Sequence, residues 1–234
     1  MPTTPAGFNT RIDRLKADLV EQGRRVQALL ESAFESVFDF DVPRADSVIA
    51  GDDQIDRVDV AIEQASVRLL ADATSQNAAL TTDQLRSILT IVKVNNELER
   101  IADAAVAIAE RVRAVQAMRT PLPGTFRVMA NSVVGILRDA VDSLDRRDPT
   151  LAKLVLQSQD AVSAFKAQLL RDAEKNIADG SMTVDFAFAL HELASQCELM
   201  DDHCTNIAEQ VIYAATGAIV RHAEGQWSEV PSGT

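Results

Sequence analysis

The chain has few aromatic, glycine and proline residues, and this scarcity excludes several fold classes. Aromatic residues make up 4% of its 234 residues, alongside nine glycines and seven prolines. A β-sandwich or β-barrel needs many turns, for which glycine and proline are the usual residues. The abundant aliphatic residues favour long helices instead, and the length suffices for one substantial domain or two small ones.

Basic residues are too few to recognise a polyanion. The chain has 23 Lys and Arg residues and 35 Asp and Glu residues, which gives a formal net charge of −12. Nucleic-acid binding needs clustered Lys and Arg, so we expect no nucleic-acid partner. An anionic membrane surface is excluded on the same ground. A divalent cation or a basic surface on another protein suits this acidity better.

Long hydrophobic runs and a targeting segment are also missing. The longest apolar stretch, around Val211 to Val220, is too short to span a bilayer. Met1 to Phe8 lacks the charged and apolar parts of a signal peptide. We therefore expect a cytoplasmic protein with no direct membrane insertion.

Cysteine is almost absent, since Cys197 and Cys204 are the only two. On one helix their Cα atoms would lie about 10 Å apart along the axis. A disulfide tolerates about 7 Å, so we expect two reduced core residues.

What the chain does have is a helical period of 3.6 along nearly its whole length. The predicted helices cover residues 9–38, 44–72, 81–118, 125–144, 149–180 and 183–223. Thr81 and Gln84 have capping-box spacing, and Asp148-Pro149 is typical of a helix start. We expect the polar tail from Glu224 to Thr234 to be frayed, apart from Trp227.

Pro121-Leu122-Pro123-Gly124 is the clearest linker, and it divides the chain into halves with the same order of helices. The predicted fold is therefore all-α. It has six long helices in two tandem, sequence-related three-helix bundles, covering residues 1–120 and 121–234.

One acidic helical segment occurs in both halves. Each copy has an acid, a second acid four residues on and a third acid seven residues beyond that. The two sets are Glu99, Asp103 and Glu110, then Glu198, Asp202 and Glu209. At about 100° per residue, each set lies on one narrow helix face. Like charges at this spacing repel by a few tenths of a kcal/mol, so we expect a bound cation.

The alternative is that each acidic face is simply exposed to solvent, as most charged helix faces are. Two observations weigh against it: alanine and other small residues surround the acids, and lysine is absent from both segments. Carboxylate and carboxamide oxygens suit Mg²⁺, Mn²⁺, Ca²⁺ or iron.

One helix supplies too few ligands for a six-coordinate ion, so other residues must contribute. Asp53 and Asp56 on the second predicted helix are candidates for the first site. Asn206 and, on the fifth helix, Asp160 are candidates for the second, and His203 could reach its edge. Glu110 and Glu209 are further candidates.

Signatures of catalysis are missing. Helical-bundle di-iron enzymes use Glu-x-x-His, and none of His191, His203 and His222 has Glu three residues before it. The chain also has no glycine-rich phosphate loop. We expect a protein that is not an enzyme, with a carboxylate-bridged metalloenzyme as a remote alternative.

These residues also resemble a known family. The segment from Glu198 to Glu209, continuing through Val211-Ile212-Tyr213, Thr216-Gly217 and Val220-Arg221-His222, is similar to the C-terminal signature of PhoU proteins. Asn96 to Asp103 resembles the N-terminal signature of the same family. The resemblance covers almost the whole chain.

The resemblance implies a fold of two three-helix bundles and metal ions held by the acidic motifs. Iron is the first expectation, with zinc, manganese or magnesium as alternatives. It also implies a negative regulator of phosphate uptake and phosphate-starvation signalling, often dimeric, that contacts a phosphate ABC transporter ATPase and a sensor histidine kinase. A helical interaction scaffold with vestigial metal sites is the alternative.

The two copies depart from the family pattern in different ways. The first has Ala107 at its third four-residue step, where the family usually has Asp or Asn. The second has Asp201 where the family tends to have Gly, and Ser163 where the first half has Asp56. We expect unequal sites, and the more complete helix-borne motif narrowly favours metal in the second.

Overall fold

The chain folds into six long helices followed by a short hairpin. The computed structural model describes residues 5–223 and 226–230. The helices are α1 (Pro5–Asp39), α2 (Val42–Ser75), α3 (Thr82–Met118), α4 (Gly124–Arg146), α5 (Pro149–Ala178) and α6 (Val184–Thr216). The predicted all-α fold with six helices is confirmed.

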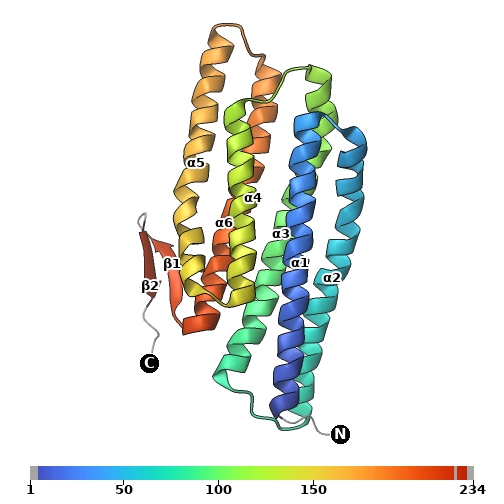
Figure 1. Ribbon diagram of the computed structural model, residues 1–234, viewed down its shortest axis with the longest axis vertical. Helices are drawn as coiled ribbons and strands as arrows, with labels where there is room; N and C mark the ends of the chain where they lie inside the picture. The colour runs from blue at the N-terminus through green and yellow to red at the C-terminus, as the bar shows by residue number, and fades with distance from the viewer. Residues whose placement is uncertain (1–4, 224–225, 231–234) are drawn as a thin grey trace.

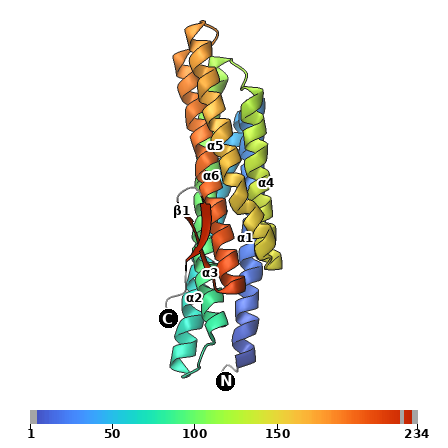
Figure 2. The same ribbon diagram turned by 90° about the vertical axis from the view of Figure 1, so that its left-hand side faces the viewer.

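Two three-helix bundles lie side by side along their length (Figures 1 and 2). Within the first, α1, α2 and α3 pack against one another, and α4, α5 and α6 do the same in the second. Contacts of α1 with α4 and of α3 with α6 join the bundles. All six helices contribute to one apolar core, and α2 and α5 lie at opposite edges (Figure 1).

Side-chain caps fix where α2, α3, α5 and α6 begin. The predicted capping box at α3 is confirmed, because Thr81 Oγ1 accepts from the Gln84 amide and the Gln84 side chain accepts from the Thr81 amide. Asp148 Oδ1 caps α5 by accepting from the Thr150 amide, ahead of Pro149. Such caps satisfy amide donors that have no partner within the helix.

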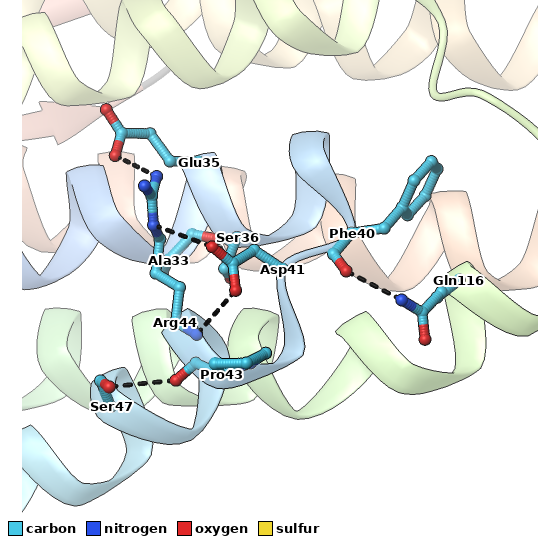
Figure 3. Close-up of polar contacts among 9 residues, drawn as sticks. All are labelled: Ala33, Glu35, Ser36, Phe40, Asp41, Pro43, Arg44, Ser47 and Gln116. Atoms are coloured by element: carbon cyan, nitrogen blue, oxygen red, sulfur yellow. Dashed lines mark hydrogen bonds and ion pairs between the residues drawn. The ribbon is translucent and has the colours of Figure 1, made fainter.

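The turn between α1 and α2 is held by a small polar cluster (Figure 3). Asp41 accepts from the Arg44 amide at 3.0 Å, and the Arg44 guanidinium lies 2.5 Å from Glu35. Gln116 of α3 donates to the Phe40 carbonyl at 2.9 Å (Figure 3). The turn is thereby attached to the third helix of its own bundle.

Helix α6 ends at Thr216, so the prediction that it continues to residue 223 is wrong. Gly217 adopts φ 78° and donates its amide to the Tyr213 carbonyl, a typical helix stop. Strand β1 (Ile219–Ala223) then pairs antiparallel with β2 (Gln226–Val230). The predicted frayed tail is wrong for 226–230, whereas residues 224–225 and 231–234 and the side chain of Trp227 lie outside the described part.

Both cysteines lie in the apolar core, on the buried face of α6. Cys197 and Cys204 are both buried and free, as predicted. Throughout the described part of the chain, no helix is both long and apolar enough to cross a membrane.

Candidate functional site

The acids of the first repeat gather between α2 and α3. The predicted residues Asp53, Asp56, Glu99 and Asp103 are joined by two residues that the sequence analysis missed, Asp52 and Asp59. We refer to these six residues as the first acidic cluster. Glu99, Asp52 and Asp59 are half-buried, and the other three are exposed.

Burial and mutual repulsion perturb the cluster. Burial raises the pKa of Glu99, and the charges of Asp103 and Asp59 raise it further. The pKa of Asp52 is raised by burial and then by Asp56 and Asp103. Among the described residues, no Lys or Arg forms a salt bridge with any of the six. The negative charge of the first acidic cluster is therefore offset only in part, by the charge of Arg100 near Glu99 and by a hydrogen bond from Asn95 to Asp59.

The donor chemistry of this cluster fits a hard cation. All of its side chains offer carboxylate oxygens, and Oδ1 of Asp52 is buried without a hydrogen-bond partner. No three His, Cys, Asp or Glu side chains of the described residues already converge at metal-binding geometry. Binding would therefore require exposed side chains, such as those of Asp56 and Asp103, to turn inward.

The second acidic helix has a different environment. Lys166 Nζ of α5 lies 2.6 Å from Oε2 of Glu198, and Ser163 Oγ donates to Oε1 at 3.3 Å. Asp202 and Asp160 are exposed. Glu198 is thus already satisfied by a cation and a hydroxyl from the neighbouring helix.

Asn206 and His203 contact the other repeat. Asn206 Nδ2 donates to Glu97 Oε2 of α3 at 3.1 Å, and His203 Nδ1 lies 2.7 Å from the same oxygen. Burial alone would raise the pKa of Glu97, but the hydrogen bonds from His203 and Asn206 outweigh it and leave the pKa below its ordinary value. These two predicted site residues therefore hold α6 to α3.

A polar groove of about 550 Å³ lies where α2, α3 and α6 meet. Its lining includes Asp59, Asn95, Glu97, Asn206 and Glu209. Glu209 is buried here, whereas Glu110, its counterpart in the first repeat, is exposed. The third acids of the two motifs therefore have unlike environments.

Asp201 is a further residue that the sequence analysis did not assign to the site. It is 1% exposed, and its Oδ1 has no hydrogen-bond partner. Burial, with the charges of Asp202 and Glu198, raises its pKa to about 7. Its position one residue before Asp202 was visible in the sequence, but its burial depends on the packing of α6.

Comparison with known proteins gives one consistent result. A family model described as the PhoU domain matches residues 19–112 and again 126–211. A Zymomonas mobilis protein described as a phosphate-specific transport system accessory protein PhoU homolog is 30% identical over 216 residues, covering 92% of this chain and 89% of its own.

Solved structures agree with that match. The crystal structure of PhoU from Pseudomonas aeruginosa is 27% identical, with a TM-score of 0.83 over 90% of this chain and 99% of that one. A phosphate transport system regulatory protein PhoU from Streptococcus pneumoniae shares the fold, with a TM-score of 0.84 over 92% of this chain and 100% of that one, at 20% identity.

Proposed function

The chain belongs to the PhoU family, and we propose that it is a regulatory accessory protein of a phosphate-specific transport system. The observation that carries this proposal is the match of the PhoU domain to both repeats. The Zymomonas mobilis relative described as such an accessory protein covers nine-tenths of the chain, which supports the proposal further.

The proposed action is negative regulation of phosphate uptake and of phosphate-starvation signalling. The protein would act in the cytoplasm through contacts with the transporter ATPase and a sensor kinase, as a homodimer. Its net charge of −12 suits basic partner surfaces. The missing catalytic signatures make a binding role the simpler proposal.

We further propose that the first acidic cluster binds a metal ion, iron first and manganese, magnesium or zinc as alternatives. The buried Asp52 oxygen without a partner and the lack of salt bridges to the cluster support this. A bound cation would neutralise the repulsion between α2 and α3. The metal would thereby stabilise the face that these two helices present to partners.

Deletion of the gene tests the regulatory role. We expect alkaline phosphatase activity to rise in phosphate-rich medium, and the wild-type gene to restore repression. Unchanged repression in the deletion strain would contradict the role. A variant with Asp103→Ala then reports whether the acidic cluster contributes to repression.

Elemental analysis of the purified protein tests the metal separately. After reconstitution with iron or manganese, we expect Asp103→Ala to lose bound metal and the exposed control Glu174→Ala to retain it. Wild-type protein without bound metal would favour the alternative, a helical scaffold with vestigial sites. Oxygen-dependent redox turnover that Asp103→Ala abolishes would instead favour the remote metalloenzyme alternative.

A further inference from the structure

The residues that the outer helices place beside Glu99 and Glu198 have opposite charges. Glu99 of α3 has Asp59 of α2 beside it, and the charge of Asp59 raises the pKa of Glu99. Glu198, the equivalent residue of α6, has Lys166 of α5 beside it instead, at 2.6 Å. The same motif position is therefore repelled in one repeat and paired in the other.

This difference extends along the outer helices. When Asp56 is matched to Ser163, the same offset matches Asp59 to Lys166. It also matches Asp52 to Gln159 and Asp53 to Asp160. Four aspartates of α2, with formal charge −4, thus correspond to one aspartate, one lysine and two uncharged residues of α5, whose charges cancel.

The contact between Lys166 and Glu198 is partly shielded from water. The Lys166 side chain is 18% exposed and that of Glu198 is 36% exposed. Ser163 Oγ donates to the second carboxylate oxygen, so both oxygens of Glu198 have a donor from α5. A dication that bound Glu198 would have to displace Lys166 and leave its charge unpaired in a sheltered position, which is unfavourable.

We propose that the Lys166 ammonium is the resident counter-ion of the second acidic helix and replaces a metal ion there. The second repeat is accordingly metal-independent. The proposal depends on the proposed function only in assigning metal to the first repeat, because the contacts of Glu198 are independent of that assignment. It also reverses the expectation from the sequence alone, which narrowly favours metal binding by the second acidic copy.

The test introduces the acids of α2 into α5. Lys166→Asp with Ser163→Asp gives α5 the residues that α2 has at the equivalent positions. The parent is full-length protein in which Asp56→Asn and Glu99→Gln remove charge from the first acidic cluster. In equilibrium dialysis we expect the parent to bind no stoichiometric Mn²⁺. We expect the derived variant to bind about one ion per chain, with a dissociation constant at least tenfold below that of any residual binding by the parent.

A matched control makes the same charge change elsewhere on α5. Lys153→Asp with Gln157→Asp changes two exposed residues one turn apart, and we expect no gain in Mn²⁺ binding. An equal gain in this control, or no gain in a folded Lys166→Asp, Ser163→Asp variant, would overturn the proposal. Circular dichroism verifies that each variant is folded.

Two further measurements cover the remaining outcomes. If the aspartate variant does not fold, Lys166→Met in the same parent is the alternative, because it leaves Glu198 without its counter-ion. We expect Mn²⁺ to raise the melting temperature of the Lys166→Met variant. No rise would overturn the proposal. In otherwise wild-type protein, loss of bound Mn²⁺ on Glu198→Gln would also overturn it. Wild-type protein that binds no Mn²⁺ would contradict only the metal site of the first repeat, because a gain from Lys166→Asp with Ser163→Asp still supports the counter-ion.

Discussion

His203 Nδ1 lies 2.7 Å from Oε2 of Glu97, and this contact links the third helix of one repeat to the third helix of the other. A carboxylate only accepts hydrogen bonds, so Nδ1 carries the proton. Asn206 donates to the same oxygen, which gives Glu97 two donors from α6. Glu97 lines the polar groove, but its side chain is only 19% exposed, so a carboxylate without these donors would be costly there.

We expect Glu97→Gln to lower the free energy of unfolding by about 1.5–3 kcal/mol at pH 7, the range for hydrogen bonds to charged groups. The pKa of Glu97 in the folded protein is below its ordinary value of 4.5, so its contribution is present above pH 4.5 and declines as the pH falls further. Urea unfolding at pH 7 and pH 3.5 measures this difference. The exposed Glu110→Gln on the same helix should change stability by under about 0.5 kcal/mol; an equal effect of both variants would contradict the assignment.

Gly23 of α1 allows close packing against α4. A Cβ at Gly23 would lie 2.8 Å from a methyl carbon of Val141, whose branched side chain has little rotamer freedom. We expect Gly23→Ala to destabilise the protein by about 1–3 kcal/mol through overpacking, which outweighs the gain of about 1 kcal/mol in helix propensity. Thermal unfolding measures the change.

Gly135 of α4 is the matched control for this prediction. A Cβ there would have no atom within 4 Å. We expect Gly135→Ala to stabilise the protein by about 0.5–1 kcal/mol, since only helix propensity changes. If both alanine variants changed the melting temperature in the same direction, close packing at Gly23 would not be the cause.

The fold could be predicted further from the sequence than the site could. Caps such as Thr81 with Gln84 are local, so their residues identify the helix starts. The end of α6 was missed because Gly217 lies inside an apolar segment that has helical spacing. There the left-handed glycine and the strand pairing of Ile219–Ala223 determine the structure.

The site depends on how each helix is rotated about its axis, which the sequence does not specify. Asp53 and Asp52 are adjacent, and only packing makes Asp52 the more buried of the two. Glu97 is two residues from Glu99 and therefore lies on another helix face, toward a partner 106 residues away. Lys166 was likewise missed, because its contact with Glu198 depends on the register between α5 and α6.

Removal of one charge from the first acidic cluster should change the free energy of unfolding in opposite directions with and without bound metal. In chelator-treated protein, Asp56→Asn removes a charge that raises the pKa of both Asp52 and Glu99. We expect a gain of a few tenths to about 1 kcal/mol in the free energy of unfolding. With Mn²⁺ present, the same variant should be less stable than wild type because it loses a ligand. Thermal melts in both conditions measure the change of sign, and a gain in both would contradict metal binding by the cluster.

The two thiols should be inert in the folded protein. Burial raises the pKa of Cys197 to about 12 and that of Cys204 well above its ordinary value. The thiolate is the reactive form, so we expect neither to react with Ellman's reagent at pH 8, and both to react in urea. Rapid reaction of one thiol in native buffer would show that α6 opens locally.

Asp201 should stabilise the folded protein at acidic pH but not at neutral pH. Its pKa rises from 3.8 to about 7 on folding, so its stabilising contribution is present below pH 3.8 and is lost as the pH rises towards 7. Ala102 occupies the equivalent position of the first repeat, which makes Asp201→Ala the natural substitution. We expect Asp201→Ala to raise the free energy of unfolding by about 1–3 kcal/mol at pH 8, because each pKa unit corresponds to about 1.4 kcal/mol and the lost packing offsets part of the gain.

At pH 4 the same substitution should bring no gain, since Asp201 is then protonated in the folded protein. Urea unfolding of wild type and Asp201→Ala between pH 4 and pH 8 measures the difference. Leu199→Ala, two residues earlier on α6 and exposed, is the control, and its effect should not depend on pH because it changes no ionisable group. A pH-independent difference between wild type and Asp201→Ala would mean that the buried carboxyl keeps its ordinary pKa, and that its partnerless oxygen finds a donor when the protein is in solution.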